Sequence, residues 1–528
     1  MKVTRRHLVW GPALATIATV AAGEIFFAAA VAAASTNDTS RAQVMIAFKP
    51  GAAAAARSAV AKAGGRVVAD LSEVNGLAIE LPAAAVRQLQ QHASIEFVED
   101  DAPRHAFAKT SAGTNGAAQS PAQTVPYGIS MVQADRVSDA FASDRKLCIV
   151  DSGIDASHED LQGIAMDGDN LSKSGEWFTD ESGHGTHVAG TIAAVDNAIG
   201  VIGVLPNRQV RLHIAKVFDV SGSASTSTII RGMIACMRAN ANVVSMSLGG
   251  DVPSQLEQRI TNLLASRDML LIAAAGNSGN GAVSYPAGYA TVVSVAAVDQ
   301  NMAAAEFSQF NLDVELAGPG VNVLSTIPMG TGIDVALTVG GTPYFALPTE
   351  GTPVASASAP LADFGLGDTA ASGSMTGKMC LIQRGSVSFA TKVLNCEASG
   401  GAGAIIYNNV AGAVIAILGG AVTTIPSVTV TQADGTAMLG QLGQTVALTL
   451  TPSSYATFDG TSMATPHVSG VAALVWSYHP ACTAEQVRAT LDKSALDLGA
   501  PRRDDHFGFG LVQAKAAFDR IAALGCGN

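Results

Sequence analysis

Residues 460–470 are Gly460-Thr461-Ser462-Met463-Ala464-Thr465-Pro466-His467-Val468-Ser469-Gly470, and an apolar run continues from them to residue 476. This run predicts a buried helix. A proline is tolerated in the first turn of a helix, where its missing N–H has no partner in any case, so we expect Ser462 at or just before the helix N-terminus. Helix N-termini favour developing negative charge, as a serine nucleophile requires, although a lone serine at such a place is more often only a helix cap.

The composition limits the class of protein. The chain has 528 residues, of which 48% are hydrophobic and 14% charged, so we expect a globular protein with two or more domains. The net charge of −12, with no basic cluster after residue 6, argues against nucleic acid as a partner. Six cysteines are too few for a disulfide scaffold but permit three bridges in an oxidising compartment.

Residues 1–34 have the pattern of a secretory signal. A basic start is followed by an apolar segment and by Ala32-Ala33-Ala34, which offers small-residue cleavage sites. We therefore expect a secreted protein, with Arg5-Arg6 leaving both the general and the twin-arginine export routes open. The alternative is an uncleaved membrane anchor, because residues 8–34 are long enough to span a bilayer, but Glu24 in the middle weakens it.

Four further regions follow, with different patterns. Residues 35–107 contain the order βαββαβ, which predicts a small ferredoxin-like α+β unit, and 108–124 have a linker composition. Residues 125–330 alternate continuous apolar strands with helices, which indicates an α/β fold with a doubly wound, mainly parallel sheet. Residues 331–455 are rich in Gly, Thr and short strands and predict a β-rich insertion, after which the α/β pattern resumes at 456–528.

Three other residues complete the chemistry that a serine nucleophile needs. His184, among small residues before an apolar helix, is the candidate base, and Asp151, at the end of an apolar strand, is the candidate carboxylate. Asn277 follows another strand and could donate its amide to an oxyanion. We interpret His187 as a packing residue, and Asp155 as a weaker rival of Asp151. Each short motif alone is more often a turn, but the four together, in the order Asp, His, Ser, point to acyl transfer.

The motifs around these residues resemble those of the subtilisin-like serine peptidases: Asp151-Ser152-Gly153-Ile154-Asp155, Gly183-His184-Gly185-Thr186-His187, Ala274-Ala275-Gly276-Asn277 and Gly460-Thr461-Ser462-Met463-Ala464. The resemblance implies a serine endopeptidase acting on proteins or peptides. Its catalytic residues would be Asp151, His184, Ser462 and Asn277. It also implies that the backbone of the substrate pairs with the edges formed by Ser247, Leu248, Gly249, Ala274 and Gly276.

The same family suggests roles for the outer regions. Residues 331–455 resemble a protease-associated (PA) domain, by their Cys-Leu-Ile-Gln-Arg-Gly and Ala-Ile-Ile-Tyr-Asn-Asn strands. Residues 35–107 resemble the family's propeptide, which implies an intramolecular inhibitor removed by self-cleavage near Phe107, with further trimming to about Ala122. The resemblance implies a monomer without a stable membrane anchor after signal cleavage.

A structural calcium ion is a further implication of the resemblance, with no organic cofactor. The loop at residues 195–201 resembles the family's strong calcium loop, whose oxygen-only ligation suits Ca²⁺. The matching ligand positions are Gln123, Asp160, Val195, Asn197, Ile199 and Val201. The alternative is a plain loop that uses Asn197 as a turn residue.

The cysteines and the substrate wall complete the expectations. Cys380 and Cys396 are expected to pair, Cys482 and Cys526 are a second candidate pair, and Cys148 and Cys236 fit buried thiols. The small residues near Ala274 and Ser284, which are expected to line the substrate site, carry no charge, so we expect broad specificity for uncharged bulky residues before the cut.

Two alternative functions remain. One is a binding protein with an inactive peptidase scaffold, against which the complete triad argues. The other is an esterase, which would need the motif Gly-x-Ser-x-Gly.

Overall fold

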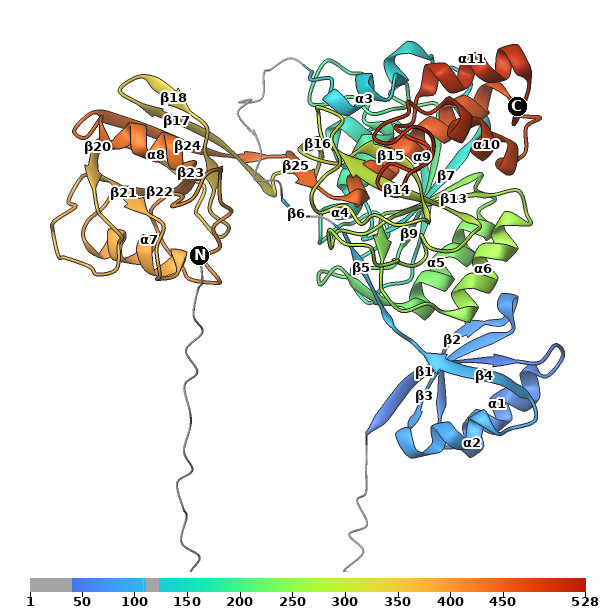
Figure 1. The fold of residues 1–528 in the computed structure, drawn as a ribbon. Coiled ribbons are helices and arrows are strands. Elements are labelled where there is room, and N and C mark those ends of the chain that lie inside the picture. The colour runs from blue at the N-terminus through green and yellow to red at the C-terminus, as the bar shows by residue number, and fades with distance from the viewer. Residues whose placement is uncertain (1–39, 108, 111–122) are drawn as a thin grey trace, which may run out of the picture.

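The computed structural model describes residues 40–107, 109–110 and 123–528. The expected signal at 1–34 and most of the expected linker at 108–124 lie outside these residues. Figure 1 shows three bodies: an N-terminal unit in blue, a large central body, and an inserted lobe in yellow and orange. In the described part of the chain, no helix combines the length and the apolar character needed to cross a membrane.

The N-terminal unit has the expected α+β fold. Its four strands form an antiparallel sheet in the order β2-β3-β1-β4. Its elements are β1 (Arg41–Phe48), α1 (Ala53–Lys62), β2 (Arg66–Leu71), β3 (Gly76–Pro82), α2 (Val86–Gln90) and β4 (Ile95–Asp100). Successive side chains of β1 point to opposite faces of the sheet, and both faces are covered. Ile46 packs with the helices of the unit, and Met45 packs against the central body. The unit therefore docks through one whole face of its sheet.

The central body contains a seven-stranded parallel sheet in the order β15-β14-β13-β11-β7-β9-β8. The strands are β7 (Lys146–Asp151), β8 (Ala165–Asn170), β9 (Arg211–Lys216), β11 (Val243–Met246), β13 (Leu270–Ala274), β14 (Val292–Val298) and β15 (Val314–Pro319). Helices α4 (His184–Ala193) and α9 (Thr461–Tyr478) cover one face, and α5 (Thr226–Arg238) and α6 (Gln255–Ala265) cover the other. The doubly wound α/β class is confirmed.

The sequence pattern did not reveal two edge strands. Strand β8 pairs only with β9, and its residues alternate between exposed and half-buried, so it lacks the continuous apolar run of the inner strands. Strand β15 contains Glu315 and ends at Pro319, so its sequence also lacks a continuous apolar run.

The expectation for Pro466 is wrong. Helix α9 begins at Thr461, so Pro466 is its sixth residue and lies inside the helix rather than in the first turn. A residue at this position would ordinarily donate its N–H to the carbonyl of Ser462. That carbonyl instead accepts a 2.8 Å hydrogen bond from the Ser247 hydroxyl, so the proline leaves no unsatisfied acceptor.

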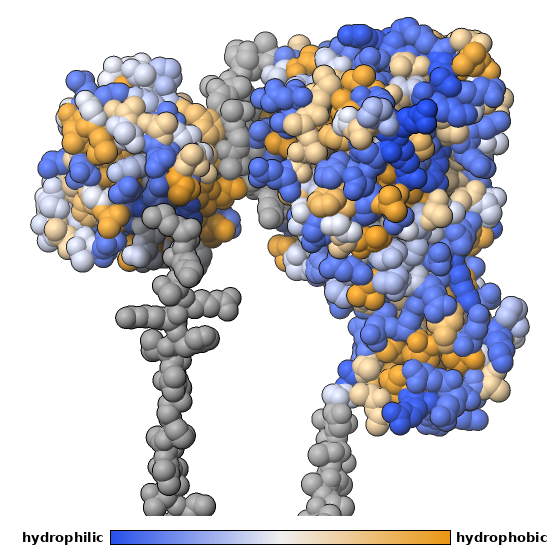
Figure 2. All heavy atoms as spheres, in the orientation of Figure 1, coloured by the Kyte–Doolittle hydropathy of each residue, from blue (hydrophilic) through white to orange (hydrophobic). Residues whose placement is uncertain are grey.

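The insertion is β-rich, as expected, and has its own core. Its eight strands follow the order β18-β17-β24-β20-β21-β22-β23-β19, with helices α7 (Phe389–Ala398) and α8 (Gln432–Leu439) beside them. The strands are β17 (Gly332–Val339), β18 (Thr342–Tyr344), β19 (Leu347–Pro348), β20 (Ser356–Asp363), β21 (Met379–Gln383), β22 (Gly403–Tyr407), β23 (Ser427–Val430) and β24 (Thr445–Ser453). Figure 2 shows it as a separate lobe beside the central body.

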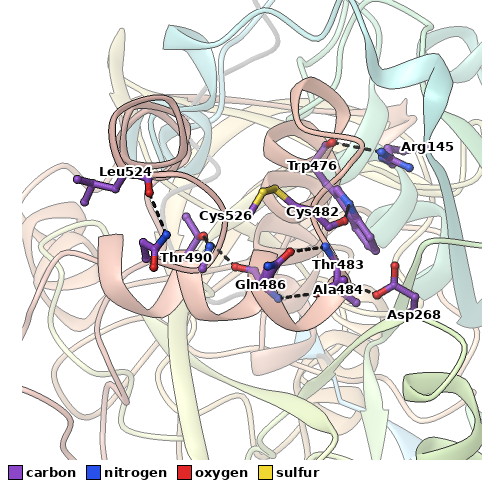
Figure 3. Close-up of a disulfide and its surroundings, with 12 residues drawn as sticks. Arg145, Asp268, Trp476, Cys482, Thr483, Ala484, Gln486, Thr490, Leu524 and Cys526 are labelled. Carbon is purple, nitrogen blue, oxygen red and sulfur yellow. Dashed lines mark hydrogen bonds between the residues drawn. A yellow bond between two sulfur atoms is a disulfide. The ribbon is translucent and has the colours of Figure 1, made fainter.

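All six cysteines are paired. Cys380 bonds to Cys396 inside the insertion, and Cys482 bonds to Cys526, which ties the start of α10 (Ala484–Ser494) to the C-terminal end after α11 (Ala514–Leu524). Figure 3 shows this second bridge beside Trp476. The interpretation of Cys148 and Cys236 as buried thiols is wrong, because they form a disulfide between β7 and α5. Their 88-residue separation gave no sign that the two apolar segments pack together.

Candidate active site

The predicted nucleophile, base and carboxylate all lie at the carboxyl end of the parallel sheet. Asp151 is the last residue of β7, His184 the first of α4, and Ser462 lies in the first turn of α9. His184 Nδ1 is 2.6 Å from Asp151 Oδ1, an oxygen that also accepts the Ser152 N–H. Ser462 Oγ donates to the Ser247 carbonyl at 2.9 Å. His184 Nε2 has no hydrogen-bond partner among the described residues, so it is available to accept a proton.

The three buried histidines of this region have different electrostatic states. Burial opposes the protonation of His184, but the Asp151 carboxylate outweighs it, and Asp180 adds to it, so the pKa of His184 is raised. Burial lowers the pKa of His187 to about 3 and that of His467 to about 4. These two rings are therefore neutral wherever His184 titrates.

The two rival residues lie apart from this chemistry. His187 Nε2 faces the Val323 carbonyl at 3.0 Å, and its ring stacks on Phe458 with a centroid distance of 4.4 Å. Asp155 accepts hydrogen bonds from Ser157 and from the Met329 N–H. Both side chains serve local packing and turn structure in this conformation.

Asp180 is a buried carboxylate that the sequence motifs did not single out. Its Oδ1 accepts from Ser152 Oγ and from the N–H groups of Ser182 and Gly183. Its Oδ2 accepts from the N–H and the hydroxyl of Thr186. Burial raises its pKa, while the hydrogen bonds from Thr186, Ser152 and Gly183 oppose that effect. Asp180 thus joins the strand that ends in Asp151 to the N-terminus of α4, and its position four residues before His184 was the available signal.

Asn277 is held in one orientation beside the nucleophile. Its Oδ1 accepts both the N–H and the hydroxyl of Thr461, at 2.9 and 2.8 Å. Its Nδ2 is therefore left to donate to the carbonyl of Phe107, at 2.9 Å. The Phe107 N–H donates to Ser462 Oγ at 3.2 Å. The peptide carbonyl that follows β5 thus lies where an oxyanion would be stabilised.

Strand β5 (Pro103–Ala106) brings the end of the N-terminal unit into the site. It forms a three-stranded antiparallel sheet between β10 (Ser223–Ser225) and β12 (Leu248–Gly249). Leu248 pairs with Ala106 and Gly249 with His105, as the resemblance implied for a substrate. Of the other candidate substrate residues, Ser247 contacts Ser462, Ala274 ends the buried strand β13, and the Gly276 N–H donates to Thr461 Oγ1.

The Phe107 ring lies against Gly249. A Cβ added to Gly249 would come within 2.6 Å of the Phe107 ring and would also meet the Ser284 hydroxyl. Only glycine therefore leaves room for a large ring at this place. The buried Ser284 hydroxyl has no hydrogen-bond partner in the described residues, and the pocket around the ring has no charged group among these contacts.

Beyond Phe107, the backbone of β6 (Lys109–Thr110) pairs with β25 (Tyr455–Asp459). Residues of β25 line a cavity of about 590 Å³, and residues of the insertion are also part of its lining. Among the described lining residues are the carboxylates Asp180, Glu181, Asp334 and Glu350, and none is Lys, Arg or His. The insertion thus contributes to a cavity that borders β25, the strand with which β6 pairs.

The six candidate calcium ligands come together at one loop. The Gln123 side-chain amide faces the carbonyls of Val195 and Val201, at 2.6 and 3.1 Å, and lies 3.4 Å from Asn197 Oδ1. The Asp160 carboxylate accepts from Asn197 Nδ2 and from the Val201 N–H. The oxygens of Val195, Asn197 and Val201 thus face the side-chain nitrogen of Gln123, and Asp160 is bonded to two of these residues. Ile199 enters these contacts only through its N–H, which donates to Asn197 Oδ1.

Three family models match the chain. The model of the subtilase family matches residues 142–362 and 416–510, and the PA domain model matches 349–438. The model of the fervidolysin N-terminal prodomain matches 27–100. The prodomain match and the PA match confirm that the chain carries an N-terminal prodomain and an inserted PA domain.

Individual proteins match as well. An alkaline protease of Alkalihalobacillus alcalophilus is 39% identical over 51% of this chain and 67% of its own length. Subtilisin Savinase of Lederbergia lenta is 42% identical over 43% of this chain and 82% of its own. The structure of the subtilisin-like protease Apa1 from Pseudoalteromonas sp. AS-11 has a TM-score of 0.60 at 40% identity, covering 77% of this chain and all of that one. Fervidolysin from Fervidobacterium pennivorans has a TM-score of 0.59 at 20% identity, covering 92% and 62%, which shows a shared fold.

Proposed function

The chain belongs to the subtilase family and is a subtilisin-type serine endopeptidase, and on this premise we propose that it is secreted as a zymogen that cuts its own prodomain at Phe107. The observation that carries the proposal is the position of the Phe107 carbonyl, 2.9 Å from Asn277 Nδ2 and beside Ser462. The Phe107 carbonyl of the chain itself thus has the contacts that we expect of a substrate carbonyl.

The proposed mechanism assigns one step to each residue. Ser462 Oγ turns from the Ser247 carbonyl to His184 Nε2, gives up its proton there and attacks the peptide carbonyl. Asp151 stabilises the resulting imidazolium through Nδ1, and Asn277 donates to the oxyanion. His184 then protonates the leaving amine, and water hydrolyses the acyl-enzyme in a second, similar step.

The prodomain fits the role of an intramolecular inhibitor because it blocks the site and also caps two helices. Glu99 accepts from the Ser254 hydroxyl and from the first N–H groups of α6, and Asp101 accepts from the N–H and hydroxyl of Ser227 in α5. Carboxylates are favourable at helix N-termini, so these contacts stabilise the docked unit. Three disulfides support export to an oxidising compartment.

We also propose that the cluster at residues 195–201 binds one structural Ca²⁺. The donors would be the carbonyls of Val195 and Val201, Asn197 Oδ1 and a carboxylate oxygen of Asp160, with Gln123 turning its amide oxygen inward. The carbonyl of Ile199 would complete the set. Bound calcium would supply a cross-link between the start of the central body and this loop.

The test of the proposed function is Ser462→Ala in the full chain. We expect an uncleaved proform and a loss of casein hydrolysis of about 10⁶-fold, which is the loss that removal of the triad serine causes in subtilisin itself. Ser477→Ala is the matched control, because this buried serine lies in the same helix and its hydroxyl donates to the Leu474 carbonyl, away from the site. The control should process normally and react with a serine-directed phosphonate. Self-cleavage by Ser462→Ala at Phe107 would contradict the proposal.

A further inference from the structure

Arg104 is a fully buried cation in a strand that leaves the protein on maturation. Its side chain and that of Glu257 are both 0% exposed, and they form an ion pair of 2.6 Å between Nη2 and Oε2. Arg104 Nε also donates to Oε1 at 3.1 Å, so the guanidinium and the carboxylate meet through two hydrogen bonds. Such a bidentate contact with a carboxylate is characteristic of the arginine guanidinium.

The walls of the pocket satisfy the remaining polar groups. Arg104 Nη2 also donates to the Val252 carbonyl at 2.9 Å, and the Tyr289 hydroxyl donates to Glu257 Oε2 at 2.9 Å. Glu257 lies in the first turn of α6, and both Glu257 and Tyr289 belong to the central body that remains after cleavage. The pocket is thus built by the enzyme, and the prodomain supplies only the arginine.

The backbone places this pocket at a fixed distance from the cut. Arg104 pairs with Ala224 in β10, Ala106 pairs with Leu248 in β12, and Phe107 carries the carbonyl beside Ser462. Counted back from Phe107 as the first residue, Arg104 is the fourth. Any substrate that pairs with β10 and β12 in the same register directs its own fourth residue toward Glu257.

Departure of the prodomain removes the cation that faces Glu257. Arg104 is its ion-pair partner among the described residues. A buried carboxylate without a cation is strongly unfavourable, whereas a paired one is tolerated. The vacated pocket therefore favours a substrate that restores the guanidinium.

We propose that Glu257 makes this peptidase select arginine at the fourth residue before the cleaved bond, together with a bulky uncharged residue immediately before it. This inference rests on the proposed cleavage by Ser462. It names a substrate class, peptides of the pattern Arg-x-x-Phe, and narrows the broad specificity expected from the small residues near Ala274 and Ser284.

The test compares three substrates of the mature enzyme, obtained by processing of the full chain: acetyl-Arg-His-Ala-Phe-p-nitroanilide, the same peptide with citrulline in place of arginine, and the same peptide with leucine in place of arginine. Citrulline keeps the shape of arginine but lacks its charge. We expect kcat/KM for the arginine peptide to exceed that for the citrulline peptide by at least about thirtyfold, the range for removal of one partner of a buried charged pair.

Two variants connect the preference to Glu257. Glu257→Gln should bring the ratio for arginine over citrulline to within about threefold, because an amide offers the guanidinium no opposite charge. If this variant fails to mature, the double variant Arg104→Leu/Glu257→Leu replaces the pair by apolar side chains, a change that buried pairs often tolerate, and should prefer the leucine peptide. Asp251→Asn is the control, because Asp251 is an exposed carboxylate next to Val252 in the chain, and it should keep the arginine preference.

The outcomes separate this inference from the proposed function. If the enzyme cleaves all three peptides at similar rates, the arginine preference is wrong and the peptidase function stands. If it cleaves none of them and no casein, the proposed function itself fails. An arginine preference that survives in Glu257→Gln, or that is lost in Asp251→Asn, would assign the selection to the overall charge and not to Glu257.

Discussion

At the scale of single residues, the site depends on two buried carboxylates, each of which accepts hydrogen bonds near His184. Asp151 and Asp180 both face the N-terminal end of α4 and both raise the pKa of His184. Asp151 touches the ring, whereas Asp180 acts through Ser152 and the N–H groups of the helix. Asp180 is thus a positioning residue, and it stabilises the protonated form of His184 through its charge.

Asp180→Asn should alter the pH dependence of the enzyme. His184 must be neutral to act as base, so kcat/KM rises with pH through its pKa. Removal of the Asp180 charge lowers that pKa, so the rising limb should move to lower pH. The amide NH₂ would also face donors from Thr186 or Gly183, so the plateau should fall by about tenfold.

The measurement is a pH profile of kcat/KM with a peptide p-nitroanilide. Glu181→Gln is the matched control, since this neighbouring carboxylate pairs with Lys216 and is not among the causes of the His184 shift. An unchanged limb in Asp180→Asn would mean that its charge has no influence on the base.

At the scale of elements, the N-termini of helices α4 and α9 both lie at the carboxyl end of the parallel sheet. Helix α9 tolerates the internal Pro466 because Ser247, at the start of the substrate edge, bonds the carbonyl that the proline leaves free. The loop after α4 carries the proposed calcium ligands, so the position of α4 and the stability of that loop are linked.

Calcium removal should lower the thermal stability of the processed enzyme. A ligand at about 100 to 1,000 times its Kd stabilises the folded state by about 3–4 kcal/mol, which corresponds to roughly 5–10 °C in Tm. We expect that shift between excess calcium and excess chelator, measured by scanning calorimetry. Asp160→Asn should abolish the calcium dependence, whereas Asp196→Asn, an exposed carboxylate in the same loop, should retain it. Equal melting curves of the wild type in both buffers would argue against the site.

At the scale of the whole molecule, three bodies meet around one extended polypeptide. The prodomain supplies β5 before the proposed cut, the central body supplies the proposed reacting groups, and the insertion contributes to the lining of the cavity that borders β25. Asp334 and Glu350 bring two carboxylates of the insertion to this cavity, and its described lining residues include no Lys, Arg or His. A substrate that extends past the cut thus meets an acidic and apolar wall.

Peptides with a lysine about four to six residues after the cut should therefore be cleaved faster than those with glutamate there. The double variant Asp334→Asn/Glu350→Gln should reduce this preference by about fivefold, the range for exposed pairs. Asp368→Asn, an exposed insertion carboxylate outside the cavity, is the control. Peptide p-nitroanilides, which end at the cut, should be unaffected in both variants. Equal rates for lysine and glutamate peptides in the wild type would exclude this role of the wall.

The sequence by itself determined the α/β class, the apolar inner strands, the prodomain order and the insertion, because these depend on local periodicity. It also placed Asp151, His184, Asn277 and Ser462 at strand and helix ends, where parallel topology brings side chains together. The candidate site was predictable to this extent because each motif is short and contiguous.

Only the tertiary structure decided the features that join distant residues. Arg104 and Glu257 lie 153 residues apart, and Cys148 and Cys236 lie 88 apart. In neither pair does the local sequence around one residue indicate its partner. The edge strand β8 has no apolar run from which it could be predicted. Burial creates these pairings: once packing excludes water, a carboxylate must have a cation or a donor, and only the folded chain shows which one is within reach.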